Sequence, residues 1–459
     1  MHIAGVLVAL HLVTAGLPAL VDEHAEAPAA KVAEQQEVAP PHEHPWLALA
    51  EVTALNGLVW AYDRFVQKQD WARVGPSTWA AGVRNGLVWD EDDFATNQFL
   101  HPYHGAFYAT AARDNGFGYW ESGLFALIGA FQWEYLAERD APSANDIINT
   151  TLGGNAMGEV LYRLSSLALD NGATGGERVR RELVAGLLSP LRGVNRLLRG
   201  DAWRLGPTPT EWRPSRFVHS VSGGWRRLTY VDSPNSVQNG VAIDVDLFYG
   251  DLFREPVRHP FDAFDARLQL ASGTSVTVVS RAEILGALAA HAFLRTEQES
   301  FLLGVGQAYR YANNRAYELG AQSFDGGLFY RRQLWAGTEV RASLLLRGVL
   351  LAAISSEYAA RTGRNYDYGP GLGIQLEAMF SRGDWNILTF EAGSSWIHPV
   401  SGSNGNHFVR FGRLKLDVPV YGHWGLGGAF DLFVRESHYE SLGDVFRRSP
   451  QFQVFVSFH

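Results

Sequence analysis

The chain of 459 residues contains no cysteine, which excludes disulfides and thiolate metal sites. Any zinc site would therefore need histidine and carboxylate ligands. Charged residues make up only 19% of the chain, and the net charge of -9 argues against nucleic acid as a partner. Beyond the N-terminal region, the chain lacks a run of about 20 apolar residues, so we expect no later membrane-spanning helix.

Aromatic residues and glycine are abundant by contrast. Aromatics make up 12% of the chain, and 48 residues are glycine. This composition is typical of sheet-rich proteins, including barrels that face lipid. The length exceeds that of one ordinary core, so we expect two or more domains.

The N-terminus "MHIAGVLVALHLVTAGLPAL" is an apolar run of signal-peptide length. Small residues follow at Ala25 and Ala27, and we predict a signal peptide over residues 1–27. Residues 28–45, rich in Ala, Glu, Pro and His, predict a disordered tether. A single anchor helix is the alternative, because no Lys or Arg precedes the apolar run.

The rest of the chain divides into two halves with different periods. Residues 46–205 carry apolar residues at helical spacing, and the clearest helices are expected at 46–67, 119–139, 143–169 and 177–188. The proline-rich "GPTPTEWRPS", residues 206–215, is the predicted linker. From residue 216 to 459 the period changes to two, which indicates strands.

The strand half predicts an antiparallel transmembrane barrel of about 12 strands, making the protein α+β. In "HFVRFGRLKLDV", for example, Leu414 and Leu416 lie on the face opposite Arg413 and Lys415. The closing strand "FQVFVSFH" resembles the C-terminal assembly signal of outer-membrane proteins, although His459 follows the last aromatic residue. Outer-membrane lipid and the outer-membrane assembly machinery are the implied partners. A soluble barrel or sandwich is the alternative, because alternation does not say which face points inward.

The stretch "NQFLHPYHGAFYATAARDNG", residues 97–116, concentrates ionisable and aromatic side chains. Pro102 suits the first turn of a helix, so His101 is expected to precede that helix. His104 and Tyr108 are four residues apart and share a face. Gly116 ends the helix as a C-cap.

A second stretch, residues 133–165, predicts a capping box and a close helix contact. Ser143 caps a helix, and Asp146 is expected to reach back to the cap. Gly154 and Gly158 would let two helices approach closely. Glu159 and Arg163 form an i,i+4 ion pair of small value if it is exposed.

Together these stretches hold many ionisable groups for fairly apolar helices. If they converge, burial requires ion pairing, metal binding or shifted pKa values. A structural polar network, a catalytic centre and a metal or ligand site are the three interpretations. The candidate catalytic residues are His104, Glu134 and Asp146. The wider polar cluster comprises His101, Tyr108, Arg113, Asp114, Glu121, Glu138, Thr150, Glu159 and Arg163. We predict no cofactor and leave a metal open.

At these residues the sequence resembles the DUF3943 family of bacterial envelope proteins. The resemblance rests on "NQFLHPYHGAFYATAARDNGFGYWESG", "WEYLAERDAPSANDIINTTLGGNAMGEVLYRLS" and "SPLRGVNRLLRG", and continues with "DVDLFYGD" and "HPFDAFDARLQL". The family has no assigned function, so it implies an envelope location rather than an activity. The segment 134–158 is also similar to the VanZ-like pattern, which implies one cluster of His104, Glu134 and Asp146, near lipid.

We therefore predict an outer-membrane protein whose helical domain docks on the periplasmic mouth of the barrel or plugs its lumen. Its role would be envelope transport, lipid handling or structural support, with a small molecule or a lipid as ligand. The alternative is an envelope enzyme, a lipid hydrolase or acyltransferase with His104 as base and Glu134 or Asp146 as its carboxylate. A soluble lipid-binding barrel is a third hypothesis.

Overall fold

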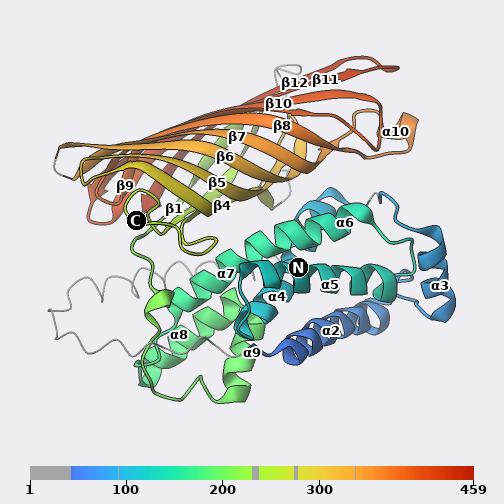
Figure 1. Ribbon diagram of the computed structural model, residues 1–459. Helices are drawn as coiled ribbons and strands as arrows, with labels where there is room; N and C mark the ends of the chain where they lie inside the picture. Colours follow the sequence, from blue (N-terminus) through green and yellow to red (C-terminus); the bar gives the residue numbers. More distant parts are fainter. Residues whose placement is uncertain (1–42, 91, 230–236, 273–277, 336) are drawn as a thin grey trace. The chain divides into compact units, whose positions relative to one another are not determined.

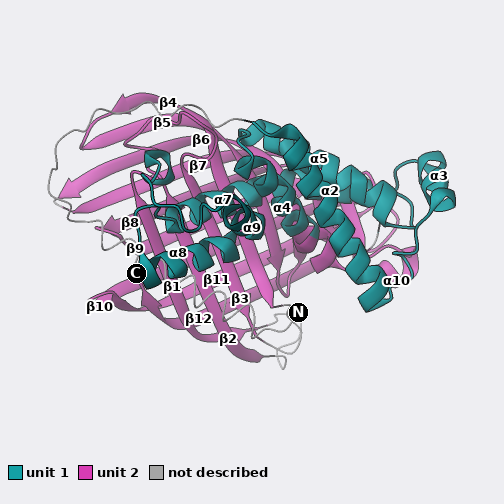
Figure 2. Ribbon diagram, turned by 90° about the horizontal axis from the view of Figure 1, so that it is seen from below, with its two compact units in different colours: residues 1–90, 101–213 teal, residues 91–100, 214–459 magenta. Residues whose placement is uncertain are grey.

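The computed structural model describes residues 43–459 except 91, 230–236, 273–277 and 336. The expected signal peptide and nearly all of the expected tether lie outside these residues. The described chain forms two compact units, coloured separately in Figure 2. Unit 1 holds residues up to 90 and 101–213, and unit 2 holds 91–100 and 214–459.

Unit 1 is helical. Its helices are α2 (Pro45–Ala61), α3 (Pro76–Asn85), α4 (His101–Asp114), α5 (Tyr119–Gln132), α6 (Ala144–Ile148), α7 (Gly154–Ala168), α8 (Gly175–Leu188) and α9 (Pro190–Arg199). Short π-helical turns continue α2 over Tyr62–Gln67 (η2) and α5 over Trp133–Ala137 (η4), and a third, Asn149–Gly153 (η5), joins α6 to α7. A 3-10 turn, η6, spans Thr210–Trp212. None of the described helices has both the length and the hydropathy of a membrane span.

Close packing of α4 on α7 organises this unit, and the predicted glycine contact is confirmed. A Cβ atom on Gly154 would lie 2.6 Å from the Cα of Gly105, and one on Gly158 would lie 2.8 Å from the Cβ of Ala109. A Cβ atom on Gly105 would come within 1.9 Å of the Thr150 carbonyl oxygen. The two backbones therefore touch, which only glycine at these positions allows.

The start of α4 differs from the sequence expectation. A π-helical turn, η3 (Thr96–Leu100), runs directly into α4, so His101 lies on the helix rather than before it. The hydrogen-bonding pattern changes from π to α between Leu100 and His101. Pro102, which has no backbone N–H to donate, is tolerated next to this change because the regular α-helical pattern is interrupted there. The predicted C-cap is confirmed, because Gly116 has a φ of 92°.

Unit 2 confirms the predicted barrel. Twelve antiparallel strands form one closed sheet in which each strand pairs with its sequence neighbours and β1 pairs with β12 (Figure 1). The strands are β1 (Phe217–Leu228), β2 (Gln238–Tyr249), β3 (Phe264–Ala271), β4 (Val279–Arg295), β5 (Glu299–Asn313), β6 (Glu318–Trp335), β7 (Thr338–Ser355), β8 (Tyr366–Arg382), β9 (Trp385–Ile397), β10 (Gly405–Tyr421), β11 (Trp424–Tyr439) and β12 (Val445–Phe458). One short helix, α10 (Ala359–Thr362), lies between β7 and β8.

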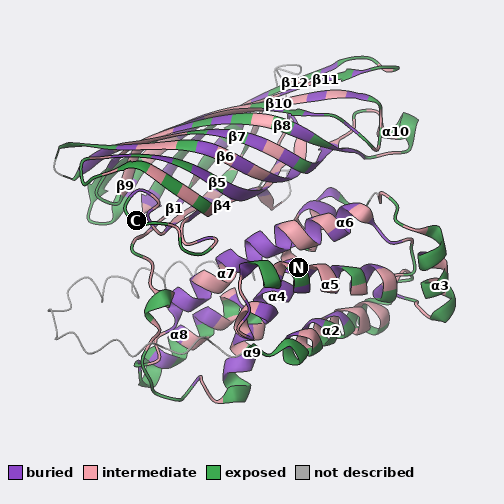
Figure 3. Cartoon of the chain, viewed as in Figure 1, coloured by how far each residue is buried: buried purple, intermediate pink, exposed green. Residues whose placement is uncertain are grey.

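The structure shows that the polar face of the strands points into the barrel and the aliphatic face points outward. Along β10, Arg413, Lys415 and Asp417 are buried in the barrel interior, whereas Leu414 and Leu416 are 49% and 47% exposed. The same alternation of buried and exposed residues bands the strands in Figure 3. A soluble barrel buries its aliphatic side chains, whereas a transmembrane barrel turns them to lipid. The barrel is therefore of the transmembrane type.

One part of the outer wall departs from this pattern. Outward-facing positions near the end of β5 and the start of β8 are tyrosines, and the segment before α4 packs on them. The Phe94 ring lies 5.2 Å from that of Tyr311, and the Tyr309 hydroxyl donates to the Gln98 carbonyl oxygen at 2.7 Å. The Asn97 side chain donates to the Tyr368 hydroxyl at 3.3 Å. These contacts explain why residues 91–100 belong to unit 2 although helices flank them.

Candidate functional site

His104 and Tyr108 meet on α4, as their spacing predicted. The His104 Nε2 atom lies 3.1 Å from the Tyr108 hydroxyl, which donates to the Asn56 side-chain oxygen. The His104 ring also packs edge-on against Trp133 at 5.0 Å. Burial, followed by the neighbouring His101, lowers the pKa of His104 to about 3. The imidazole is therefore neutral at physiological pH.

Asp146 and His101 form a second group. The Asp146 Oδ1 atom lies 3.9 Å from His101 Nε2 and accepts a hydrogen bond from Asn145 at 3.1 Å. The Thr150 hydroxyl lies 3.4 Å from His101 Nδ1. Burial, reinforced by the charge of Asp90, raises the pKa of Asp146 well above its usual range, and burial lowers the pKa of His101 to about 4. Burial thus favours the neutral form of both groups.

Of the two capping hydrogen bonds predicted at Ser143, one is present as predicted and the other is made by a different residue. The Ser143 hydroxyl accepts a hydrogen bond from the Asp146 amide at 3.2 Å, as expected. The bond back to the cap comes from Glu134, whose Oε2 atom accepts from the Ser143 amide at 2.7 Å. Glu138 is bound elsewhere, since its carboxylate accepts from the Trp133 indole at 2.6 Å. A carboxylate outside the helix can thus replace the one that a capping box expects.

The Glu159 pair is buried rather than exposed. Glu159 is 1% exposed, and its two oxygens lie 2.8 Å from Arg113 Nε and 2.7 Å from Arg163 Nε. Asp114 lies in a separate group with the arginines of α9, and Glu121 is exposed in the first turn of α5. The predicted i,i+4 pair is therefore present, but the small value expected for an exposed pair does not apply, because Arg113 of α4 also contacts Glu159 and the carboxylate is buried.

The predicted residues consequently fall into several neighbouring groups. Some of these groups still interact through their charges, since His101 lowers the pKa of His104 and Glu134 raises the pKa of Asp146. The hydrogen bonds described above, however, join the residues of each group to separate partners: Tyr108 for His104, Asn145 for Asp146 and the Ser143 amide for Glu134. Within the described residues no cluster of three or more His, Asp or Glu has metal-ligand geometry. These contacts link α4 with the segment from η4 to α7.

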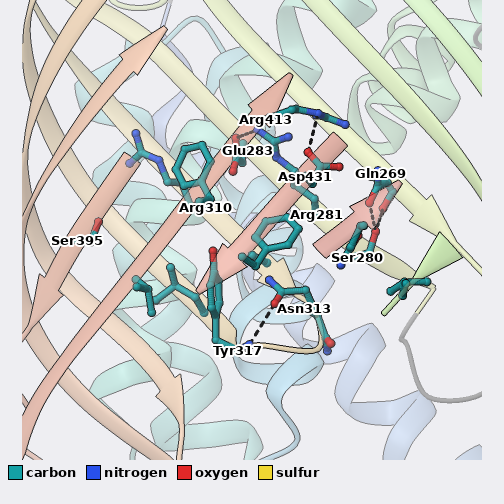
Figure 4. Close-up of a pocket in the computed structure, with 18 of the residues that line it drawn as sticks. Gln269, Ser280, Arg281, Glu283, Arg310, Asn313, Tyr317, Ser395, Arg413 and Asp431 are labelled. Carbon is teal, nitrogen blue, oxygen red and sulfur yellow. Dashed lines mark hydrogen bonds and ion pairs between the residues drawn. The ribbon is translucent and has the colours of Figure 1, made fainter. Parts of the chain in front are cut away.

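A second candidate site lies inside the barrel and was not singled out from the sequence. A cavity near the β5–β6 connection, drawn in Figure 4, has a volume of about 40 Å³. Its charged lining consists of Arg226, Arg281, Glu283, Arg310, Arg347, Arg413 and Asp431. Five guanidinium groups therefore face this space together with two carboxylates.

Three of these arginines are bound to carboxylates. Arg281 lies 2.7 Å from Glu283, and Arg413 lies 3.1 Å from Asp431. Arg310 lies 2.5 Å from Asp325 and also donates to the Ser323 hydroxyl. Such pairs offset the cost of burying charge only when the geometry is good, as it is here.

The other two arginines have spare hydrogen-bonding capacity. Arg226 is 2% exposed and has no carboxylate within 4.0 Å among the described residues, and its one hydrogen bond in that part of the chain goes to Gln269 at 3.3 Å. Arg347 is 5% exposed and lies 3.5 Å from Asp325, the carboxylate that Arg310 already holds. Both side chains leave Nε and Nη2 without a hydrogen-bond partner in the described structure. A buried donor left in this way costs free energy unless an anion or water binds it.

A second cavity lies at the other end of the barrel, where the β2–β3 connection turns inward. Its volume is about 100 Å³, and aromatic and aliphatic residues make up most of its lining. The charged residues of this lining are Asp251, Asp265, Asp325, Arg341 and Glu377. Phe253 and Phe261 of this connection are buried, and Phe261 has a φ of 65°. The connection thus fills part of the barrel's end with its own side chains.

The sequence contained a signal for the arginine-lined cavity. Arg347 and Arg413 each occupy a strand position whose two chain neighbours are an apolar residue and a glycine, which is unusual for a surface strand. Their convergence could not be read from it, because the pairing register that brings β1, β4, β7 and β10 around one space is a property of the closed sheet.

Comparison with solved structures finds outer-membrane channels. The KdgM porin is 9% identical, with 52% of this chain and 98% of that chain aligned at a TM-score of 0.24. An outer membrane channel from Pseudomonas putida F1 is 11% identical, with 55% and 99% aligned at 0.29. The Pseudomonas putida toluene transporter TodX is 8% identical, with 54% and 90% aligned at 0.22. No curated protein matches the chain.

A family model matches the helical part of the chain. The matched residues, 86–191, run through α4 to α8 and stop before the barrel. They include "HPYHG", the Ser143 cap and the glycines that join α4 to α7. The quoted resemblance at "DVDLFYGD" and "HPFDAFDARLQL" lies beyond the matched residues. The chain carries the domain of unknown function DUF3943 over residues 86–191.

Proposed function

We propose that this protein is an outer-membrane barrel whose lumen passes small anionic solutes through a narrow, arginine-lined constriction. The observation that carries the proposal is the pair of buried guanidinium groups of Arg226 and Arg347, whose Nε and Nη2 atoms have no hydrogen-bond partner among the described residues. They lie in a cavity lined by five arginines and two carboxylates. Rings of arginine or lysine give pores anion selectivity. A carboxylate or phosphate group would satisfy these donors in a forked geometry.

The membrane location follows from the outer wall. Its aliphatic side chains require lipid, and only a closed barrel can satisfy strand hydrogen bonds there. The connections at the end that holds Phe458 are mostly short, as between Trp335 and Thr338, which is typical of the periplasmic side. On this orientation the arginine-lined cavity, beside Asn313 and Tyr317, lies toward the cell exterior.

We also propose that the helical domain docks on the barrel and does not plug the barrel lumen. A helix with side chains is about 10 Å across. The lumen cavities have room for only a few water molecules, and paired charges fill the space between them. The lumen therefore favours a constricted passage lined by its own side chains.

Ion selectivity in a planar lipid bilayer tests this function. The full-length protein should conduct weakly and prefer chloride to potassium in a salt gradient. Arg226→Gln and Arg347→Gln should each lower the anion-to-cation permeability ratio severalfold, because each removes an unbalanced positive charge. Arg410→Gln is the matched control, since Arg410 points outward and pairs with Glu436.

Two results would overturn the proposal. One is a wild-type protein that is inserted and folded but passes no ions at all. The other is a cation preference, or a selectivity that Arg226→Gln, Arg347→Gln and Arg410→Gln leave equally unchanged. Insertion is checked separately by the slow migration of folded barrels in unheated gels, so a failure to assemble is not mistaken for a closed pore.

A further inference from the structure

The helices α8 and α9 have the reverse of the polarity expected for a domain surrounded by water. Their inward faces carry arginines, with Arg178, Arg181, Arg192 and Arg196 all at most 7% exposed. Their outward faces carry aliphatic residues that are 47% to 81% exposed. This aliphatic face comprises Val179, Leu183, Leu187, Val194, Leu197 and Leu198.

The buried arginines are held by unit 1 itself. Arg196 lies 2.8 Å from Glu182, and Arg178 donates to the carbonyl oxygen of Ala202 at 2.9 Å. Arg192 donates to the Ser166 hydroxyl at 2.6 Å, and its guanidinium group lies over the Tyr162 ring. Because each inward face is fixed by contacts within the unit, the opposite faces of α8 and α9 point away from it.

The two aliphatic stripes belong to one face. The helices cross where Gly193 approaches Gly186, since a Cβ atom on Gly193 would lie 2.8 Å from the Gly186 Cα. The crossing brings the outward residues at 187 and 194 to the same part of the hairpin. Soluble monomers rarely expose contiguous apolar patches above a few hundred Å², so such a face needs a partner.

We propose that the aliphatic face of α8 and α9 inserts into membrane lipid beside the barrel. Lipid is the surrounding that favours this polarity, because it solvates leucine and leaves arginine to pair inside the protein. The barrel already places the chain at a bilayer. Arg180, Arg199 and Arg204 remain exposed beside the face, and Trp203 is 68% exposed next to them. Basic and tryptophan side chains at this position suit lipid phosphates and the headgroup layer.

Site-directed fluorescence tests this insertion on the full-length protein. Because the chain has no native cysteine, Leu198→Cys and Leu183→Cys can each be labelled at one site with an environment-sensitive fluorophore. The labelled protein is reconstituted in phosphatidylethanolamine and phosphatidylglycerol vesicles that contain lipids with a nitroxide on the acyl chain. We expect blue-shifted emission and roughly twofold or greater quenching at both sites, since inserted helices bury their apolar face about 5–10 Å deep.

Asp140→Cys is the matched control, because Asp140 is exposed in the polar turn before α6. Its label should emit as in water and resist quenching. Water-like emission at residue 198 or 183 would overturn the proposal. So would blue-shifted emission without quenching, which would mean that protein, either the barrel wall or a second copy, covers the face. Ion conduction plays no part in this readout, so its result is independent of the proposed transport.

Discussion

Neutralising Glu159 should loosen α4 and α7 far more than its i,i+4 spacing suggests. The carboxylate is 1% exposed and contacts Arg113 and Arg163 at 2.8 Å and 2.7 Å. Breaking a buried ion pair by removing one partner costs about 3–5 kcal/mol, because charge stays buried without its counter-charge. Since Glu159→Gln keeps an amide oxygen near both guanidinium groups, we expect about 3 kcal/mol, at the low end of that range.

Hydrogen exchange of the full-length protein, read by mass spectrometry on peptides from α4 and α7, measures this change. A loss of about 3 kcal/mol corresponds to roughly a 150-fold faster exchange through local opening. Asp201→Asn is the matched control, because its pair with Arg204 is exposed and such pairs contribute at most about 1 kcal/mol. If Glu159→Gln and Asp201→Asn changed exchange equally, by less than about fivefold, the reasoning from burial would be refuted.

Three further predictions concern packing, pH and the outer wall. Gly154→Ala should destabilise unit 1 by about 1–3 kcal/mol through overpacking, whereas Gly176→Ala, with open space around it, should change little; thermal unfolding followed by circular dichroism compares them. Burial lowers the pKa of His104 to about 3, so the folded protein favours the neutral imidazole. The stability that the neutral His104 contributes is complete above about pH 6.5 and is lost as the pH falls toward 3, by up to about 1.4 kcal/mol per pH unit. Exchange of the α4 peptide at pH 7 and pH 5, corrected for intrinsic rates, should show this loss in the wild type and less of it in His104→Gln. Leu416→Arg should cost about 2–4 kcal/mol in urea unfolding from vesicles, and no change would mean that this face does not meet lipid.

Local sequence patterns predicted most of the secondary structure but not two of the shorter helices. Alternation along "RLKLDV" fixed strand conformation at 413–418, and the same pattern repeated often enough to predict about 12 strands. Gly154 and Gly158 predicted a close helix contact because only glycine leaves room for it. The helices α3 and α9 were not among those expected, since each is only ten residues long and so offers fewer than three turns of pattern.

The site was less predictable than the fold. Asp146 fits a helix cap by spacing, yet the bond back to that cap comes from Glu134, nine residues before Ser143. The i,i+4 spacing predicted the pair of Glu159 with Arg163, but it did not predict the second contact, with Arg113 of α4, or the burial of the carboxylate. Arg226 and Arg347, far apart in the chain, line one cavity because β1 and β7 belong to the same closed barrel.

The sequence by itself determined that two faces of each element differ, and tertiary structure decided which of them points inward. Periodicity records a contrast between neighbouring side chains, and it has the same form whether lipid or water surrounds the protein. Leu416 and Lys415 would alternate in the same way in a soluble and in a transmembrane barrel. Leu198 and Arg196 would likewise lie on opposite faces of α9 whether the helix were surrounded by water or by lipid. Closure of the sheet put Lys415 inside, and packing of α9 within unit 1 put Arg196 inside, because the counter-charges that offset the cost of burying these groups lie there.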